Sequence, residues 1–260
     1  HLVIMVHGLS LSELGWSRDG KPDIGSRLAS EFDCTPLYLR YNTGRHISTN
    51  GREFNTLLDQ LCAAWPVPVE SISLVGHSMG GLVMRSACQV AEVEGLAWRD
   101  RLRRIVFLGT PHQGAPLERG GNWVTLALDK SSYTAAFARL GRIRSAGITD
   151  LRYGNVRDED WEGTDRFDLG KDQRKTVPLP EKTRCFCVAA TTATKRGPLA
   201  DRLIGDGLVP VNSALGSHGK TDKAIAFDSE CQWIAYRMNH MELLSRPEVT
   251  EKIVQWLTPE

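Results

Sequence analysis

The sequence predicts a doubly wound α/β fold, with helices covering both faces of a mostly parallel β-sheet. Short unbroken apolar runs, typical of strands buried on both faces, alternate with stretches of helical periodicity. The chain has 260 residues, and its 32 Lys and Arg nearly balance its 31 Asp and Glu. This length suits one large domain over residues 1–260, and this charge balance gives no electrostatic drive toward nucleic acid or an anionic membrane.

The first half of the chain keeps the strand–helix alternation. Leu2-Val3-Ile4-Met5-Val6 is an apolar run that ends at His7-Gly8, as a buried strand does before its loop. In the next segment Ile24, Leu28 and Phe32 lie four residues apart and form one stripe of a helix. Further strands are predicted at 35–41, 71–76 and 104–109, and helices at 22–32, 52–64 and 80–93.

The alternation then stops between residues 111 and 182. A structureless connection of this length is uncommon in a compact domain, so we interpret it as a lid or cap insertion with short helices near 123–129 and 133–140. Its apolar residues either line a pocket for an acyl chain or pack the two helices onto the sheet. Regular structure resumes with strands at 184–190 and 232–236 and a closing helix at 248–257.

The six cysteines are dispersed, without a C-x-x-C pair, which does not fit a disulfide scaffold. Cys185 and Cys187 alternate in an apolar run, so both are expected on one side of a strand. We interpret them as buried free thiols, with a disulfide or a metal pair as the alternative. Scattered thiols favour the cytoplasm, but the compartment stays open because the start of the chain is missing.

The chain begins at His1, inside an apolar run and without Met or a signal peptide. We therefore expect the sequence to be a trimmed or processed piece. It contains no stretch of 18 apolar residues, so no transmembrane segment is expected.

Gly76-His77-Ser78-Met79-Gly80 fits the pattern G-x-S-x-G. The pattern alone is a weak signal in a chain with 24 glycines, but its context is the one required, because an apolar strand precedes it and a helix is predicted beyond it. Such an elbow holds the serine in a strained backbone conformation with its hydroxyl clear of the sheet. Ser78 is therefore the candidate nucleophile, and an idle serine in a glycine-rich turn is the alternative.

A serine hydroxyl needs a base to remove its proton. His77 adjoins the serine and must point elsewhere. In the chain order serine, acid, histidine, the base lies near the C-terminus, which leaves His218 and His240. His218 occupies a polar loop, whereas His240 follows a predicted strand and is the candidate base. The early histidines that this order sets aside are His1, His7, His46 and His112.

The acid that orients the base should lie between the strand at 184–190 and His240. Asp206, in Gly205-Asp206-Gly207-Leu208-Val209-Pro210, is the candidate because glycines flank it and an apolar segment follows. Asp201 is the second choice, and Asp222 and Asp228 are more remote. The oxyanion of the reaction needs two preorganised N–H donors. These are expected from the amides of Met79, which follows the nucleophile, and Leu9, in the loop after the first strand.

Five stretches of the sequence together resemble α/β-hydrolase-fold lipases and esterases, particularly bacterial hydrolases related to GPI inositol-deacylases and true triacylglycerol lipases. They are VHGL at 6–9, GHSMGG at 76–81, LGTPHQG at 108–114, GDGLVP at 205–210 and NH at 239–240. The resemblance implies a Ser78–Asp206–His240 triad, an oxyanion hole from Leu9 and Met79, and cleavage of carboxylic esters without a cofactor. The partner would be a small-molecule or lipid ester, with transient lipid-surface contact through the insertion.

Two features depart from this family. Its sheet normally begins with strands before the His-Gly loop, and these are missing here. Some of its lipases bind a structural calcium near the catalytic histidine, where Glu242 stands, but further ligands are not legible and no metal is assigned.

Other activities fit the same residues. A thioesterase, an acyltransferase or a polyester depolymerase would use the same triad, and a catalytically inactive binding module is the alternative outside enzymology. A metal-dependent hydrolase lacks a sequence basis, because no H-E-x-x-H or comparable ligand cluster occurs.

Overall fold

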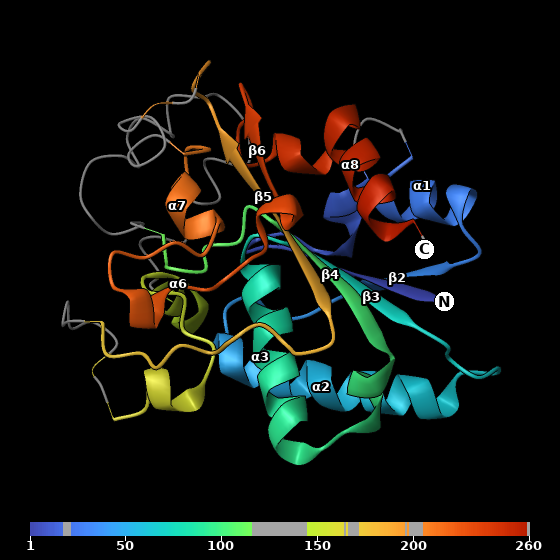
Figure 1. Cartoon of the computed structure of the whole chain (residues 1–260). Coiled ribbons are helices and arrows are strands. Elements are labelled where there is room, and N and C mark those ends of the chain that lie inside the picture. Colours follow the sequence, from blue (N-terminus) through green and yellow to red (C-terminus); the bar gives the residue numbers. More distant parts are fainter. Residues whose placement is uncertain are drawn as a thin grey trace.

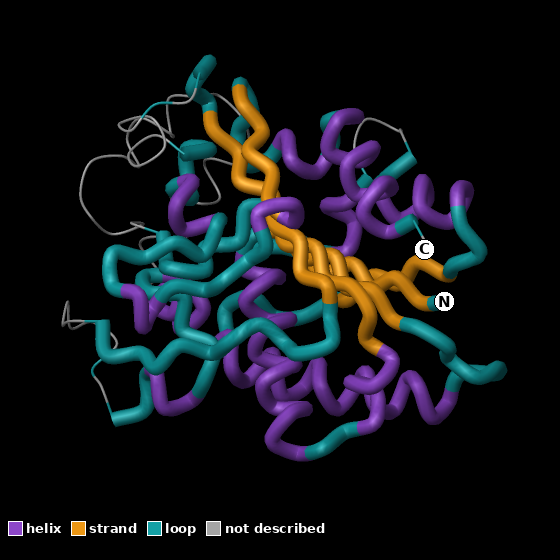
Figure 2. Tube along the Cα trace, viewed as in Figure 1, coloured by secondary structure: helices purple, strands orange, loops and turns teal. Residues whose placement is uncertain are grey.

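The computed structural model describes residues 1–17, 22–115, 145–163, 165, 172–195, 197 and 205–258. Its centre is a twisted six-stranded sheet in the order β2-β1-β3-β4-β5-β6 (Figures 1 and 2). Every neighbouring pair of strands is parallel, as predicted. The strands are β1 (Leu2–Val6), β2 (Thr35–Leu39), β3 (Ile72–His77), β4 (Leu102–Leu108), β5 (Arg184–Thr191) and β6 (Gln232–Tyr236).

Helices cover both faces of the sheet (Figure 1). Helices α1 (Ile24–Glu31) and α8 (Pro247–Leu257) lie on one face, and α2 (Ile47–Ala64) and α3 (Met79–Glu94) lie on the other. Two shorter helices are α6 (Ala146–Leu151) and α7 (Val211–Ala214). Single 3-10 turns occur at Glu13–Trp16, Ala97–Arg101, Asp158–Asp160, Thr221–Lys223, Ser229–Cys231 and Glu242–Leu244.

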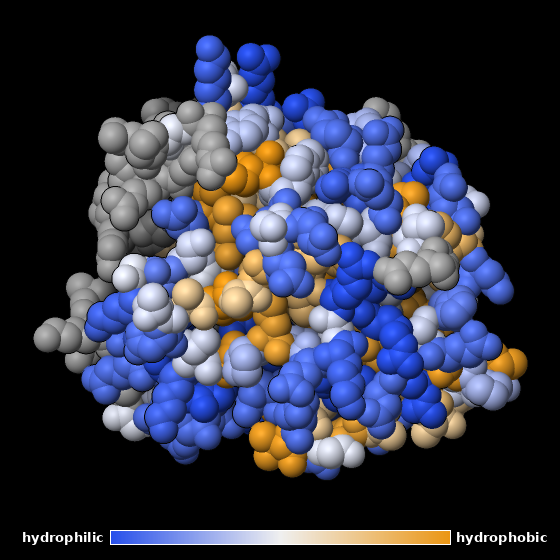
Figure 3. All heavy atoms as spheres, viewed as in Figure 1, coloured by the Kyte–Doolittle hydropathy of each residue, from blue (hydrophilic) through white to orange (hydrophobic). Residues whose placement is uncertain are grey.

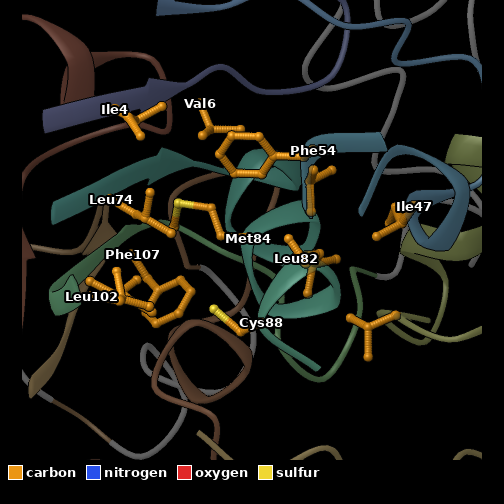
Figure 4. Close-up of a cluster of buried hydrophobic side chains, with 14 of the residues drawn as sticks. Ile4, Val6, Ile47, Phe54, Leu74, Leu82, Met84, Cys88, Leu102 and Phe107 are labelled. Carbon is orange, nitrogen blue, oxygen red and sulfur yellow. The ribbon is translucent and has the colours of Figure 1, made fainter. Parts of the chain in front are cut away.

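The alternation of side chains along each strand divides the core into two layers. Ile4 and Leu74 point toward α2 and α3, where Phe54 and Leu82 meet them (Figure 4). Their chain neighbours, such as Met5 and Val75, point to the opposite layer. A central strand such as β1 is therefore apolar on both faces, which explains its unbroken apolar run in the sequence.

Helix α2 begins at Ile47, five residues before the predicted start at residue 52. The amide of Ile47 donates to the carboxylate of Asp150, 2.8 Å away, although the two residues are 103 positions apart. Asp150 thus supplies the N-terminal cap that no neighbouring side chain provides. Sequence patterns report only local caps, so they could not locate this helix start.

Only part of the predicted insertion at 111–182 lies within the described residues. That part holds α6 and the turn at Asp158–Asp160. The helices predicted at 123–129 and 133–140 lie outside the described residues, and the lid stays a prediction.

The six cysteines are free thiols, four of them buried, and Cys185 and Cys187 both belong to the layer under α2 and α3. Figure 3 shows one face of the molecule, which is mostly polar with a band of apolar residues near its centre. No helix in the described part of the chain is long and apolar enough to cross a membrane.

His112, in the loop that follows β4, is buried against the core. The ring of His112 lies 4.8 Å from the Phe107 ring and 5.3 Å from the Phe227 ring, measured between centroids. Neither of its ring nitrogens has a hydrogen-bond partner in the described structure. Burial, together with the nearby positive charge of Arg85, holds the pKa of His112 well below 6.5.

His112→Phe is expected to reduce the loss of stability in acid. Below about pH 6.5 the unfolded histidine binds a proton that the folded one does not, so stability falls by up to about 1.4 kcal/mol per pH unit. Urea unfolding of both proteins at several values between pH 7.5 and 5 measures this slope. Identical slopes in the two proteins would contradict the buried neutral state.

Gly51→Ala is expected to lower the free energy of unfolding by about 1–3 kcal/mol. A Cβ at Gly51 on α2 would lie 2.2 Å from Oγ and 2.4 Å from Cβ of Ser86 on α3, so the two helices would have to separate. Urea denaturation measures the effect. Because Ser86→Gly removes both clashing atoms, the double variant should be more stable than the sum of the two single effects. A stabilising Gly51→Ala, as in an open helix, would refute the close approach.

Candidate active site

The candidate residues lie in loops at one edge of the sheet. In a parallel sheet the carboxyl ends of all strands share one edge, where ligands of open α/β sheets bind. The loops after β1, β3 and β6 carry Leu9, Ser78 and His240, and Asp206 lies in the loop that follows β5. Residues far apart in the sequence are brought together there by strand order alone.

Ser78 lies in a strained turn between β3 and α3. Its backbone angles are φ 55° and ψ −124°, a region that non-glycine residues rarely occupy. The turn is fixed on both sides, because the amide of Ser78 donates to the carbonyl of Leu108 at 2.8 Å and its carbonyl accepts from Gly81 at 3.1 Å. The side chain of Ser78 is therefore held at the start of α3.

The glycine at position 80 is required by a close approach of two backbones. A Cβ at Gly80 would lie 2.3 Å from the carbonyl oxygen of Val6 and 2.6 Å from that of His7. The first turn of α3 thus packs directly on the end of β1. On the other side, a Cβ at Gly8 would lie 3.0 Å from the Cβ of Ser78. The His7-Gly8-Leu9 loop therefore adjoins the serine.

Asp206 and His240 form a buried hydrogen-bonded pair. The Nδ1 atom of His240 lies 2.6 Å from Oδ2 of Asp206, and both residues are 2% exposed. The other carboxylate oxygen, Oδ1, accepts from the amides of Leu208 and Val209 at 2.9 and 2.8 Å. The backbone amide of His240 also donates to the carbonyl of Asp206. The amides of Leu208 and Val209 and the ring of His240 thus replace the water that the buried carboxylate has lost.

This pairing fixes the tautomer of the neutral His240. Because a carboxylate only accepts, Nδ1 carries the proton and Nε2 keeps its lone pair. Nε2 is buried and has no hydrogen-bond partner among the described residues, and no hydrogen bond joins it to Ser78. Such contacts are often long in the absence of substrate. The arrangement leaves Nε2 of His240 able to accept a proton.

The two candidate oxyanion amides are unengaged. Neither the Leu9 nor the Met79 amide donates a hydrogen bond within the described structure. Tyr41 anchors the loop that carries Leu9, because its hydroxyl donates to the carbonyl of His7 at 2.7 Å and its ring stacks on the His7 ring. Burial raises the pKa of Tyr41, so its hydroxyl stays a donor. Sequence reasoning missed Tyr41, since nothing local marks this contact.

The other candidate residues in the described part of the chain make different contacts. His218 accepts from the amide of Lys220 in an exposed turn, and Asp222 and Asp228 are exposed. Asp201 lies outside the described residues. The carboxylate of Glu242 accepts from the amide of Asn239 and pairs with Arg246. In the described ranges, no group of three or more His, Cys, Asp or Glu residues could hold a metal ion.

His77 is a second residue whose role the sequence did not reveal. Its side chain was expected to point away from the serine, and the structure shows where it goes. Its Nε2 atom lies 3.1 Å from the backbone carbonyl oxygen of His240. No local sequence pattern predicts this contact, because 163 positions separate the two residues.

Comparison with solved structures supports the fold. The mature form of the Bacillus licheniformis lipase BlEst2 aligns with a TM-score of 0.62 at 17% identity, over 98% of this chain and 90% of that chain. Aspergillus fumigatus lipase B aligns with a TM-score of 0.55 at 12% identity, over 100% of this chain and 52% of that chain. A Pyrobaculum calidifontis esterase aligns with a TM-score of 0.53 at 13% identity, over 98% and 74%.

At these identities the likeness establishes the fold, which is the α/β-hydrolase fold of lipases and esterases. No curated protein matches the sequence. A family model described as "PGAP1-like alpha/beta domain" matches residues 47–177, half of the chain and a stretch that includes Ser78. The resemblance inferred from the sequence is therefore confirmed, and the chain belongs to the PGAP1-like α/β domain family.

Proposed function

We propose that this protein hydrolyses carboxylic esters through a covalent acyl-enzyme formed on Ser78. The observation that carries the proposal is the buried Asp206–His240 pair. The Nε2 atom of His240 has no hydrogen-bond partner among the described residues, and His240 lies at the same edge of the sheet as the strained Ser78. A scaffold has no physical need for a strained serine or for a buried aspartate–histidine pair. The fold shared with lipases and esterases agrees with this chemistry.

In the first step Ser78 attacks the ester carbonyl while Nε2 of His240 takes the hydroxyl proton. Asp206 keeps His240 in the required tautomer and stabilises the positive charge that forms on its ring. His240 then gives the proton to the leaving alcohol, and the acyl group stays on Ser78. In the second step His240 activates a water molecule that hydrolyses the acyl-enzyme.

The amides of Leu9 and Met79 would bind the oxyanion formed in both steps. Each such donor typically contributes about 3 kcal/mol to the transition state. Both are backbone groups, so the conformation of the Leu9 loop and the first turn of α3 matters more than the identity of the two side chains.

The substrate class follows less directly. The structural neighbours are named as lipases and an esterase, which favours a lipid or small-molecule ester. Thioesters, polyesters and acyl acceptors other than water would use the same groups. A panel of p-nitrophenyl esters of graded acyl length reports the preferred acyl chain, and thioesters, polyesters and alcohol acceptors tested beside it separate these activities. Contact with a lipid surface through the insertion at 111–182 stays a prediction.

Ser78→Ala is expected to leave a folded protein with ester turnover reduced by about 10⁴-fold or more, because no other group takes over the nucleophile's role. Turnover of p-nitrophenyl butyrate and the melting temperature test the variant. A fluorophosphonate probe should label the unmodified protein at Ser78 and leave the variant unlabelled. An inactive binding module would be indicated by an unlabelled native protein, and retained hydrolysis by the pure variant would exclude Ser78 as nucleophile.

Tyr41→Phe is expected to lower kcat about tenfold or more with little change in KM. The ring stacking on His7 persists, but the His7 carbonyl loses its anchor and the Leu9 amide is less well aimed at the oxyanion; loss of a whole donor costs 10²–10³-fold. Tyr38→Phe is the matched control, since its hydroxyl bonds Asp23, which caps α1 on the opposite side of the sheet from α3. Equal losses in the two variants would argue against a role for Tyr41 in the oxyanion loop.

A further inference from the structure

His77 is the last residue of β3, directly before Ser78, and its side chain is 1% exposed. Its Nε2 atom lies 3.1 Å from the carbonyl oxygen of His240. A carbonyl oxygen only accepts hydrogen bonds, so the proton of a neutral His77 resides on Nε2. The geometry thus assigns both the direction of this bond and the tautomer of the ring.

The same imidazole contacts both loops of the candidate site. Its ring centroid lies 4.6 Å from that of His240, with the two planes tilted by 45°. Its opposite nitrogen, Nδ1, adjoins the oxyanion loop, since a Cβ at Gly8 would lie 2.9 Å from it. No larger residue fits at position 8 without moving His77. The ring therefore fills the space between the base loop and the Gly8 turn.

The backbone of His240 is held at two points. Its amide donates to the carbonyl of Asp206 at 3.1 Å, and its carbonyl accepts from His77. The first contact ties the base to the acid. The second ties it to the residue next to the nucleophile. With both ends of the residue fixed, the swing of the His240 ring relative to Ser78 is restricted.

We propose that His77 is a positioning residue that sets the place of the base relative to the nucleophile. This inference rests on the proposed function, since it assigns His240 as the base. Because His77 and Ser78 are consecutive, any shift of the elbow moves the anchor of His240 with it. The bond therefore keeps Nε2 of His240 in register with the serine hydroxyl.

The test compares His77→Phe, which keeps a planar ring but has no donor, with His77→Gln, whose side-chain amide can donate to the same carbonyl. His77→Phe should lower kcat about 10- to 100-fold with KM changed less than about threefold, since a buried carbonyl is left unpaired and the base is less well placed. His77→Gln should recover most of the loss. His112→Phe, which also buries a phenyl ring in place of a histidine, is the matched control and should retain native turnover.

Rescue by glutamine separates positioning from simple destabilisation, because only a side chain that donates to the His240 carbonyl restores the anchor. Native kcat in His77→Phe, or a loss that glutamine does not rescue, would overturn the proposal.

A measurement independent of turnover distinguishes this proposal from the proposed function. Nitrogen-15 NMR of the histidine side chains reports which nitrogen of His77 is protonated, with His77→Phe assigning the signal. Protonation at Nε2 is expected. Protonation at Nδ1 alone would refute the hydrogen bond from His77 to the His240 carbonyl, even in an active enzyme. Conversely, a native protein that neither hydrolyses esters nor takes up a fluorophosphonate refutes the proposed function, while the NMR result still decides the contact.

Discussion

The backbone of Ser78 is held in a conformation that its own residue type disfavours, and most of the neighbouring structure is needed to hold it there. The Ser78 amide is fastened to the end of β4, and its carbonyl to the first turn of α3. That turn fits only because position 80 lacks a side chain, which lets α3 start against the end of β1. Strain at one residue is thus balanced by the pairing of three strands and the packing of a helix.

Asp206 and His240 are held by the opposite means, because every oxygen of the buried carboxylate has a hydrogen-bond donor. Asp206 sits between two glycines with positive φ values of 51° and 96°, and its loop turns two amides onto one carboxylate oxygen. The other oxygen is left for His240. A carboxylate buried in this way has lost its water and depends on these donors in place of it. The rigidity of the Asp206 loop is therefore a chemical requirement as well as a structural one.

Much of this architecture could be predicted from local patterns, because strands buried on both faces must be apolar throughout and a helix must show one apolar stripe. The bounds of β6 agree with the predicted range, and α3 differs by one residue at each end. What local patterns missed depends on distant partners. Asp150 extends α2 to Ile47, Tyr41 reaches the His7 carbonyl, and His77 reaches His240. Each contact joins segments whose proximity exists only after the sheet has formed.

The strand order also has a consequence for biosynthesis. Ser78 and its turn are complete once the first four strands have paired, whereas Asp206 and His240 depend on β5 and β6, which are synthesised later. Parallel pairing across such separations is intrinsically slow, since the intervening chain must be ordered before the contact forms. A nascent chain therefore carries Ser78 for a period of its synthesis before the Asp206–His240 pair can form.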